Sequence, residues 1–406
     1  MRMFSERSIV GEGGNAWAEA RARRRAAALP LVDLVTTDPT RGGLFPEEDA
    51  QAFAAALAQG ALAPYTPVSL GLRSAREALS EVLEVTPERL VLVGSTSEAY
   101  SLLAKLLADV PGRVALPSPC YPLLPLLFAQ EGLESEVYPL VDAGLGSGGF
   151  VPVWPDALAL ERCDGGEPSF LVTVSPASPT GESLDDASFT WLTRCSRPVV
   201  IDAVFEPYAA PPLPRPLGAQ LDALPLRSLV VVLGGLSKFA GFPQAKLAWM
   251  SLHGPPALVA EARRRLSYLA DSLLSPSGPV QHALPALLRL APQRQVRLKE
   301  RLANNTLALE QACASAPWLR VKHGSSAGTG GWYRVLEVPA VFSHRAAPGD
   351  RSDVALALDL LDAGLELYPG DLFGFTTERL LILSALTPPE ALRSSLPVLL
   401  GCVDTQ

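Results

Sequence analysis

A lysine that follows a buried strand is the residue of this chain best placed to do chemistry. Lys238 comes after the apolar run Leu229–Leu233, the pair Gly234-Gly235 and Ser237. Such a run predicts a strand covered on both faces, so we expect the amine beyond its end to be desolvated. Desolvation disfavours the ammonium and leaves a neutral amine that attacks carbonyls. The alternative is an ordinary lysine in a surface loop, and the rest of the chain must decide between the two.

A second group of polar residues opens the helix expected after the strand Arg89–Val93. Ser95-Thr96-Ser97 supplies three hydroxyls at the start of that helix, and Glu98 lies in its first turn. Hydroxyls and free backbone N–H groups at a helix N-terminus form a phosphate site. The same residues are typical of a plain capping box, so taken alone they allow both interpretations.

Two further side chains at expected strand ends suit an aromatic ligand. Tyr121, within Pro119-Cys120-Tyr121-Pro122, is able to lay its ring over a flat molecule, although a packed core aromatic is the alternative. Asp202 ends a buried strand, where a carboxylate requires a cationic partner, either a protonated ring nitrogen or a structural arginine. Together with Lys238 and the phosphate site, these residues describe a phosphorylated aromatic aldehyde held by its phosphate, ring face, ring nitrogen and carbonyl.

Other ligand classes fit the sequence poorly. No G-x-G-x-x-G follows the first strand of the alternating region, which argues against a dinucleotide-binding domain. The segment Gly234–Lys238 lacks the residue order of a Walker phosphate loop. No histidine has a partner at metal-ligand spacing, so we expect no metal site and interpret each one as structural or exposed; they are His253, His282, His323 and His344.

The composition is that of a soluble globular protein in a reducing compartment. Hydrophobic residues are 48% and charged residues 19% of 406, which suits two domains or one large domain with an appendage. A net charge of -8 argues against a surface for nucleic acid or anionic membrane. The five cysteines are scattered, and neither a signal peptide nor a membrane-spanning run is recognisable. We therefore expect a cytoplasmic protein that binds neither nucleic acid nor membrane.

Strands and helices alternate through the middle of the chain, which is the pattern of an open, mostly parallel sheet with helices on both faces. Such α/β sheets bind ligands beyond the carboxyl ends of their strands. The strands expected are Arg89–Val93, Arg113–Leu116, Ser135–Leu140, Ser169–Val174, Pro198–Asp202 and Ser228–Leu233. The segments expected between them are the helices Ser97–Leu107, Leu123–Glu131, Pro155–Arg162 and Phe189–Ser196, and the glycine-rich turn Gly144–Phe150.

The two ends of the chain have a different pattern and predict a second, smaller α+β domain. We expect an N-terminal segment of residues 1–48 that packs with the small domain, a large domain of residues 49–285, and the small domain over residues 286–406. The N-terminal elements expected are helices Glu12–Leu29, Pro46–Leu62 and Arg73–Leu83, the strand-like run Leu31–Thr37 and the extended loop Ala63–Pro67. The C-terminal ones are the helical region Pro255–Ser315, strands Leu319–Lys322, Trp332–Val338 and Leu380–Ser384, and helix Asp353–Ala363.

These motifs, in this order, resemble the fold-type I pyridoxal-phosphate enzymes and within them the class I/II aminotransferases, from about Leu31 to Leu399. The resemblance implies pyridoxal 5′-phosphate as the cofactor, Lys238 as its Schiff-base lysine and Asp202 as the partner of the pyridine nitrogen. It also implies a homodimer in which Tyr65 reaches the phosphate of the neighbouring subunit. The other cofactor contacts that it implies are Ser95, Thr96, Ser97, Tyr121, Ser237, Lys246 and, in the loop Ser175–Gly181, Ser178.

Several positions depart from the pattern of the family that the chain resembles. Ser178 stands where an asparagine usually touches the 3-oxygen of the cofactor, and Phe205 stands where a tyrosine makes a second bond to that oxygen. We expect the loss of both donors to raise the pKa of the linkage between lysine and cofactor. Gly235 replaces a serine near the phosphate, and Lys246 replaces an arginine, which keeps the charge but loses the bidentate fork.

The last expected strand lacks the usual carboxylate-binding arginine. Ile382 occupies the place of the family's arginine that grips the α-carboxylate of the substrate bidentately. Arg379, three residues earlier, is the candidate substrate-binding residue, although it lies on the opposite face of an ideal strand and requires a bulge or a shifted register. The motif GLSKFAGFPQAKLAW also resembles a little-characterised branch of the aminotransferases with lysine at the position of Lys246.

The resemblance predicts a pyridoxal-phosphate-dependent aminotransferase that takes an amino acid or related amine as donor and a 2-oxo acid as acceptor. A pyridoxal-phosphate lyase, decarboxylase or substitution enzyme of secondary metabolism shares the same residues and is the alternative. A fold that has lost catalysis is disfavoured because Lys238, Asp202 and Tyr121 are all present. A binding or regulatory module is disfavoured because no DNA-binding arm is recognisable.

Overall fold

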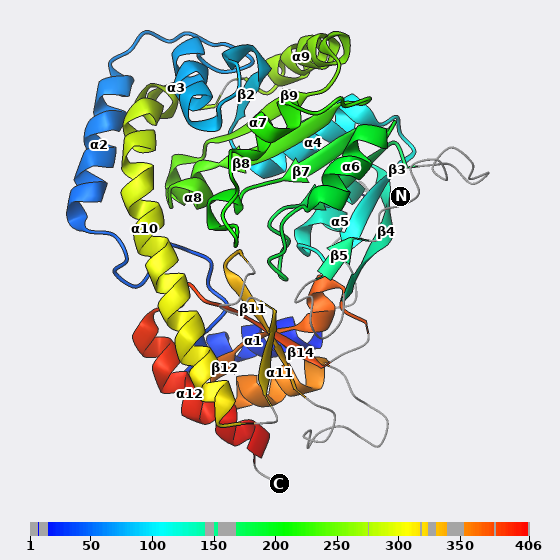
Figure 1. Ribbon diagram of the computed structural model, residues 1–406. Helices are drawn as coiled ribbons and strands as arrows, with labels where there is room; N and C mark the ends of the chain where they lie inside the picture. The colour runs from blue at the N-terminus through cyan, green and yellow to red at the C-terminus, as the bar shows by residue number, and fades with distance from the viewer. Residues whose placement is uncertain are drawn as a thin grey trace, which may run out of the picture.

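The computed structural model describes residue 7 and residues 15–142, 150–152, 168–274, 276–316, 319–323, 330–338, 353–376 and 379–404. These residues form a larger unit built on a wide sheet and a smaller unit below it, with one long helix running along both (Figure 1). The expected helix Pro155–Arg162 and nearly all of the expected turn Gly144–Phe150 lie outside the described residues.

The larger unit is built on an eight-stranded sheet whose order along the sheet is β2-β9-β8-β7-β6-β3-β4-β5. The neighbours from β8 to β4 pair in parallel, whereas β9 and β5 are antiparallel to the strands beside them. The predicted α/β class with a mostly parallel sheet is thereby confirmed. The strands are β2 (Leu90–Val93), β3 (Gly112–Ser118), β4 (Leu133–Asp142), β5 (Phe150–Pro152), β6 (Phe170–Val174), β7 (Val199–Asp202), β8 (Val230–Gly235) and β9 (Ala248–His253).

Helices cover both faces of this sheet, and the strand residues alternate between the two covered sides. Val91 and Val93 pack with α4, α5 and α9 on one face, whereas Leu90 and Leu92 pack with α3 and the first half of α10 on the other. Burial on both faces explains why these strands read as continuous apolar runs. The helices of this unit are α2 (Glu47–Ala61), α3 (Arg73–Leu83), α4 (Thr96–Leu107), α5 (Leu123–Gln130), α6 (Asp186–Arg194), α7 (Leu217–Asp222), α8 (Leu236–Phe239) and α9 (Pro256–Asp271), together with part of α10 (Gly278–Ala314).

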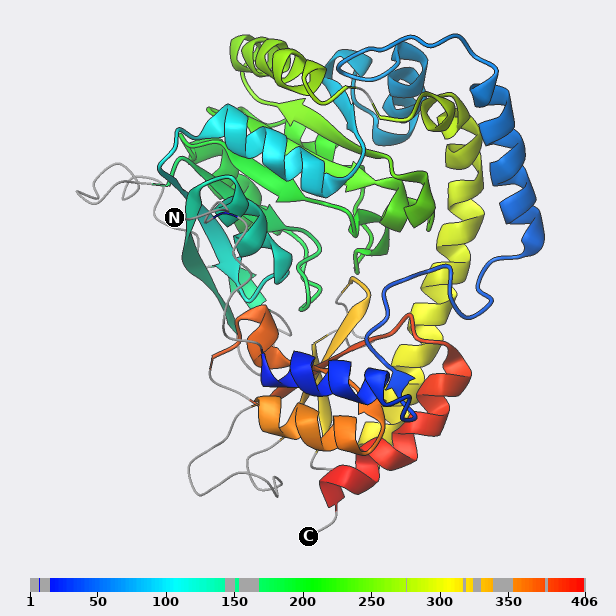
Figure 2. The same ribbon diagram turned by 180° about the vertical axis from the view of Figure 1, so that it is seen from behind.

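The smaller unit contains an antiparallel sheet in the order β10-β11-β14-β13, and a parallel pair formed by β1 and β12. Its N-terminal helix α1 lies beside α11, as Figure 2 shows from behind. Trp17 and Leu34 are buried in the same apolar cluster as Leu336 and Leu360, so the two ends of the chain share one core. The elements are α1 (Ala16–Ala26), β1 (Val32–Asp33), β10 (Arg320–His323), β11 (Tyr333–Glu337), α11 (Asp353–Asp362), β12 (Leu365–Glu366), β13 (Tyr368–Pro369), β14 (Leu380–Ser384) and α12 (Pro389–Asp404).

α10 connects the two units because its two halves pack in different cores. Leu284 and Leu287 lie in the apolar cluster beneath the large sheet, whereas Leu309 lies in the cluster of the smaller unit. At 37 residues the helix is long enough to reach both. The expected helical region Pro255–Ser315 thus forms two helices, α9 and α10.

Several elements differ from the expectation, and no helix or strand is predicted at β5, α7, α8, β12, β13 or α12. No strand is expected over Ala248–His253, yet β9 forms there and pairs antiparallel with β2 and β8. Its buried Ser251 and His253 interrupt the apolar pattern, and both are satisfied by hydrogen bonding to each other. The strand-like run Leu31–Thr37 forms only the short strand β1, because β12 offers it two partner residues.

Arg294 fixes the turn that follows Lys238. This α10 side chain donates from Nε to the carbonyl oxygen of Ala240 at 2.6 Å and from Nη2 to that of Gly241 at 2.8 Å. Its third contact is an ion pair with Asp49 of α2, 2.6 Å from Nη1 to Oδ2. The guanidinium lies between the rings of Phe45 and Phe242, with ring centroids 3.3 and 3.9 Å from Cζ. The turn, α2 and α10 are therefore held by one buried cation.

We predict that Arg294→Leu lowers the free energy of unfolding by about 3 kcal/mol, because a buried ion pair loses one partner. The measurement is a urea titration followed by circular dichroism. Arg297→Leu is the matched control: its Nη1 lies 3.4 Å from the same Asp49 oxygen, but its side chain is 37% exposed. We expect the control to cost less than about 1 kcal/mol. Equal losses in the two variants would contradict the role assigned to Arg294.

Candidate active site

A cavity of about 360 Å³ lies between the two units, at the expected strand ends. It lies at the carboxyl ends of β6, β7 and β8 and at the start of α4, with β11 of the smaller unit opposite. This is the edge of the sheet at which ligands bind in such folds. The residues that line it are Thr37, Gly94, Ser95, Thr96, Tyr121, Val174, Ser178, Asp202, Val204, Phe205, Gly235, Ser237, Lys238, Pro243, Lys246, Leu247, Ala248 and Tyr333.

Lys238 reaches this cavity from the single-turn helix α8, directly after β8. Its Nζ donates to the carbonyl oxygen of Thr37 at 3.0 Å, and its own carbonyl accepts from the hydroxyl of Tyr208 at 2.9 Å. Burial lowers the pKa of Lys238 to about 8 from the ordinary 10.5, against the attraction of the Asp38 carboxylate. The expectation of a desolvated amine at a strand end thus agrees with the geometry.

Asp202 ends β7 and contributes a buried carboxylate to the cavity. Oδ2 accepts from the hydroxyl of Tyr100 at 2.6 Å, and Oδ1 accepts from the backbone N–H of Val204 at 3.1 Å. Burial raises the pKa of Asp202 above its ordinary value, although the two hydrogen bonds act in the opposite direction. A cationic nitrogen of a ligand would compensate the charge that this carboxylate carries in a dry environment.

The start of α4 forms the polar end of the cavity. Ser95 is the N-cap residue: its Oγ accepts from the N–H of Glu98 at 3.1 Å, and the Glu98 carboxylate accepts from Gly94 N–H at 2.7 Å. The capping interpretation is therefore confirmed, and Ser95 and Thr96 also line the cavity. Ser237 and the exposed Lys246 lie on the same cavity. Hydroxyls, a helix N-terminus and a cation are the donors that bind phosphate in proteins.

The remaining walls are neutral. Tyr121, Phe205 and Tyr333 contribute rings, and Val174 and Val204 contribute aliphatic groups. A flat aromatic ligand would contact apolar surface on both faces in such a space.

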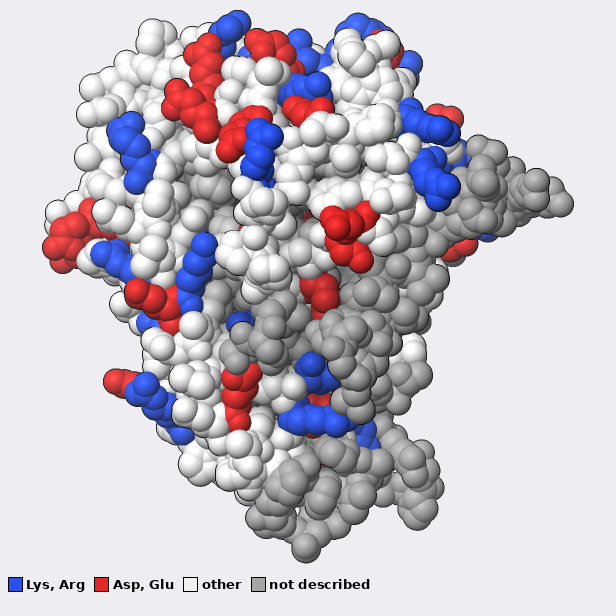
Figure 3. All heavy atoms as spheres, in the orientation of Figure 1, with Lys and Arg blue, Asp and Glu red and all other residues white. Residues whose placement is uncertain are grey.

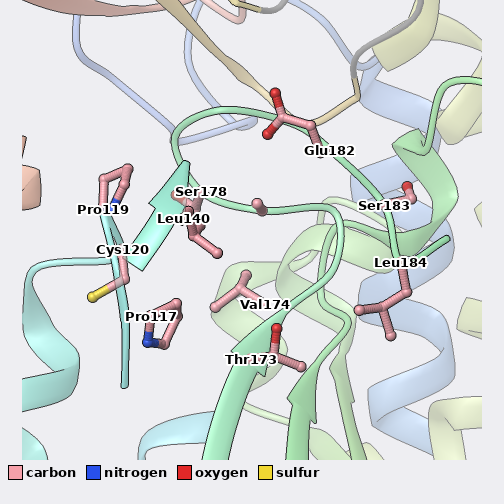
Figure 4. Close-up of a pocket in the computed structure, with 11 residues that line it drawn as sticks. Pro117, Pro119, Cys120, Leu140, Thr173, Val174, Ser178, Glu182, Ser183 and Leu184 are labelled. Atoms are coloured by element: carbon pink, nitrogen blue, oxygen red, sulfur yellow. The ribbon is translucent and has the colours of Figure 1, made fainter. Parts of the chain in front are cut away.

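A second, smaller cavity of about 20 Å³ adjoins the main one, since Val174 and Ser178 line both. Figure 4 shows Thr173 and Val174 at the end of β6, with Glu182 and Ser183 on the loop beyond it. The space is sufficient for about one water molecule. Within the described part of the chain the buried hydroxyl of Ser178 has no hydrogen-bond partner, so it is available to a ligand or a water.

Two glycines attach this loop to the smaller unit. The N–H of Gly330 donates to the carbonyl of Gly181 at 2.7 Å, and a Cβ placed on Gly181 would lie 2.4 Å from the Gly330 oxygen. Gly181 also has φ +92°, a conformation that other residues rarely adopt. The loop that carries Ser178 is thus fixed against the strand that carries Tyr333.

Three candidate residues do not reach the cavity in the described chain. Ser97 lies within α4 and is not part of the lining, and Tyr65 is 82% exposed on the surface of the larger unit. Arg379 precedes β14 and is also not part of the lining. Ile382 is fully buried in an apolar cluster with Val335 and Tyr333, on the face of the small sheet that meets the cavity.

Several lining residues and their supports are missing from the sequence expectations. Thr37 and Tyr333 come from parts of the chain far from the strand ends, and only the three-dimensional fold brings them to the site. Tyr100 lies one and a half turns into α4, where the pattern indicates only a core aromatic. No local motif identifies these three, so the sequence alone gives no signal for them.

A buried histidine elsewhere forms an arrangement that superficially resembles a hydrolytic triad. His253 contacts Asp222 through Nδ1 at 2.6 Å and Ser251 through Nε2 at 2.8 Å. In the described chain Ser251 is buried and lines a space of about 20 Å³, which holds about one water molecule. His253 is therefore a satisfied structural residue, as the sequence analysis expects.

Neither a metal site nor a membrane span is found in the described residues. No group of three or more His, Cys, Asp and Glu side chains among them is arranged to hold a metal ion. None of the helices that can be described is long and apolar enough to cross a bilayer. On the face shown in Figure 3, basic and acidic side chains are interspersed.

Comparison with known proteins gives a family and a fold. The family model described as aminotransferase class I and II matches residues 31–394. Tyrosine aminotransferase of Mus musculus is 24% identical over 277 residues, which are 65% of this chain and 58% of that protein. Alanine aminotransferase of Mycobacterium bovis is 25% identical over 232 residues, 54% of this chain and 52% of that protein. The chain therefore spans less than two thirds of the length of these curated relatives.

Solved structures of the same architecture cover the whole chain. An alanine aminotransferase from Pyrococcus furiosus superposes with a TM-score of 0.81 at 19% identity, covering 99% of this chain and 100% of that one. A double mutant of Thermus thermophilus aspartate aminotransferase superposes with a TM-score of 0.76 at 23% identity, covering 98% of each chain. At these identities the likeness shows a shared fold.

We predict that the amine of Lys238 titrates near pH 8 in the ligand-free chain. Below that pH it is mainly an ammonium and unreactive, and above it the neutral amine reacts. Brief pulses of acetic anhydride over a pH series, with mass spectrometry of the peptide containing Lys238, measure the midpoint. The same peptide in the urea-unfolded chain is the matched control and titrates near 10.5. Coinciding midpoints would contradict the burial of the amine.

Proposed function

Since this chain belongs to the aminotransferase class I and II family, we propose that it is a pyridoxal-phosphate-dependent aminotransferase acting on an amino acid or related amine. The observation that carries the proposal is the arrangement of Lys238 and Asp202 on one cavity, with phosphate-type donors at one end. An amine, a buried carboxylate and an anion site are the three groups that the aldehyde, ring nitrogen and phosphate of this cofactor require.

The lining residues fit the cofactor group by group. We assign its phosphate to Ser95, Thr96, Ser237 and Lys246, with Ser97 supporting the start of α4. We assign its ring to Tyr121 and its ring nitrogen to Asp202, whose buried carboxylate lacks a cationic partner in the described chain. Ser178 and Phe205 take the side of the 3-oxygen, where the Ser178 hydroxyl has an unused hydrogen-bonding capacity.

When bound, pyridoxal phosphate supplies an aldehyde that an amine attacks and a conjugated ring that accepts electrons from the substrate carbon. Lys238 would hold the aldehyde through its amine, and its neutral nitrogen would accept the proton of the substrate carbon. A pKa of about 8 leaves part of this nitrogen neutral at physiological pH. With the cofactor bound, the buried carboxylate of Asp202 would favour the protonated form of the ring nitrogen.

We further propose a cytoplasmic homodimer in which Tyr65 contacts the phosphate bound by the neighbouring subunit. Tyr65 is 82% exposed in an extended loop, and Leu62, which precedes it in the chain, is 89% exposed. Tyr268, which lines a surface pocket with Val68 and Ser69, is 81% exposed, and these side chains support an interface at this surface. The division of each chain into residues 1–48, 49–285 and 286–406 is proposed as well, supported by the separate cores that α10 joins. Substrate binding by Arg379 would require a change of its position, since it is not part of the cavity lining.

The cofactor assignment is tested by borohydride reduction of the protein loaded with pyridoxal phosphate. We expect the peptide containing Lys238 to gain the mass of the reduced cofactor, and Lys238→Ala to remain unlabelled. Lys246→Ala is the matched control: it keeps the label on Lys238, but its affinity for pyridoxal phosphate falls about tenfold, because one charge-assisted hydrogen bond is lost. Labelling of a different lysine in the wild-type chain would overturn the assignment of Lys238.

The reaction is tested on the same loaded protein with a panel of amino donors. An aminotransferase converts the bound cofactor to pyridoxamine phosphate, and a 2-oxo acid restores the original form. Consumption of a donor while the cofactor remains pyridoxal phosphate, with no need for an acceptor, would instead identify the lyase, decarboxylase or substitution class.

The dimer is tested through Tyr65→Phe. Light scattering is expected to give about twice the chain mass of 43.0 kDa for wild type and variant alike. We expect the variant to bind pyridoxal phosphate about tenfold more weakly, because a hydrogen bond to a charged group is lost. Tyr268→Phe, similarly exposed but not assigned to the phosphate, should bind normally. A monomeric wild type, or equal affinities in the two variants, would refute the shared site.

A further inference from the structure

An aromatic residue outside the cavity lining contacts the amine of Lys238. Nζ lies 4.5 Å from the ring centroid of Trp332 and 5.9 Å from that of Phe205. A cation within about 6 Å of an aromatic centroid is attracted by the negative face of the ring, and most strongly by tryptophan. Trp332 is fully buried, so water does not weaken the attraction.

The other groups of the described chain that act on this amine stabilise its positive charge only weakly. Its one hydrogen-bond acceptor in the described chain is the carbonyl of Thr37, at 3.0 Å. No ion pair of Lys238 occurs among the described residues, and the Asp38 carboxylate, which acts on it from a greater distance, is itself paired with Arg41. The ring of Trp332 therefore acts together with that carbonyl and the Asp38 carboxylate in favouring the charged over the neutral amine.

Trp332 is held rigidly by the elements that also hold Lys238. Its ring meets Tyr208 edge-on at 5.3 Å and Phe205 at 5.4 Å, and its carbonyl accepts from Ala385 N–H at 2.8 Å. Tyr208 in turn donates to the carbonyl of Lys238 at 2.9 Å. One tyrosine thus sets the distance between the indole ring and the backbone from which the amine extends.

We propose that Trp332 is a positioning residue that seats the free ammonium of Lys238 over its indole face, in the place the amine occupies when it is not bonded to the cofactor. This rests on the proposed function, in which the same nitrogen would hold the cofactor, accept the proton of the substrate carbon and deliver it to the former aldehyde carbon. The ring attracts the protonated nitrogen more than the neutral one. It therefore increases the proton affinity of a nitrogen that burial alone would make a poor base.

These contacts also restrict the position of the Lys238 amine, the group that carries the proton. The Thr37 carbonyl accepts one N–H of the amine, and the ring face takes up its positive charge. An amine fixed by these two contacts stays beside the cavity instead of turning toward solvent, so little reorganisation precedes each proton transfer.

The test replaces Trp332 by tryptophans carrying successively more fluorine atoms, incorporated at this codon alone. Fluorine withdraws electrons from the ring face while leaving its shape nearly unchanged, so packing is kept and only the attraction for a cation falls. We expect the pKa of Lys238 in the cofactor-free chain, measured by pulsed acetylation, to decrease stepwise by about 0.5 to 1 unit over the series.

The same series at Trp249 is the matched control, since that buried ring packs edge-on against Phe239 at 5.6 Å. We expect no trend in the pKa of Lys238 there. A flat response at Trp332, or equal trends at both positions, would overturn the proposal and leave Trp332 a packing residue.

Because acetylation is measured without cofactor, this outcome is independent of whether pyridoxal phosphate binds. A stepwise decrease with no cofactor bound to Lys238 would support the ammonium seat and refute the proposed function. A flat response in a chain whose Lys238 is bonded to the cofactor would refute the ammonium position over Trp332 and support the proposed function.

Discussion

The burial of one guanidinium, that of Arg294, is the interaction on which the geometry of the site depends. A buried cation must be surrounded by acceptors, and the carbonyls of Ala240 and Gly241 and the carboxylate of Asp49 provide them. Ala240 and Gly241 follow Lys238 in the chain. The hydrogen bonds from Arg294 to their carbonyls therefore fix the backbone from which the amine of Lys238 extends. Phe45 and Phe242 cover the two faces of the guanidinium and exclude water. Its N–H groups must therefore be bound by acceptors of the protein.

The chemistry of the site follows from what surrounds the amine as much as from the amine itself. Phe205 adds apolar surface beside Nζ. Burial among such rings lowers the pKa of Lys238, and the face of Trp332 opposes that shift without adding a competing hydrogen-bond acceptor. Asp202 works in the opposite direction, because burial favours its protonated form unless a cation lies next to it. The cavity thus contains two ionisable groups whose charges are costly until a ligand compensates them.

The sequence predicts the parts of this structure that depend on local pattern and fails where distant segments meet. Continuous apolar runs identify the strands that lead to Asp202 and Lys238, because parallel strands are buried on both faces. The sequence does not predict β9, because Ser251 and His253 are polar and unfavourable in a buried strand unless they form their mutual hydrogen bond. The contacts of Thr37 and Trp332 with the Lys238 amine are not predicted for a different reason. Neither residue belongs to a motif, and only folding of the smaller unit brings them to the amine.

Thr37 and Tyr333 close the cavity from opposite parts of the chain, and this has a consequence for the lifetime of the protein in a cell. A ligand that contacts both binds only when the two units are folded together, so its binding energy opposes unfolding of the entire chain. Free ligand at one hundred times its dissociation constant adds about 2.7 kcal/mol to the stability of such a fold. Chains without ligand open more often and are degraded by proteases first. The abundance of the protein should therefore follow the supply of that ligand, even with transcription held constant.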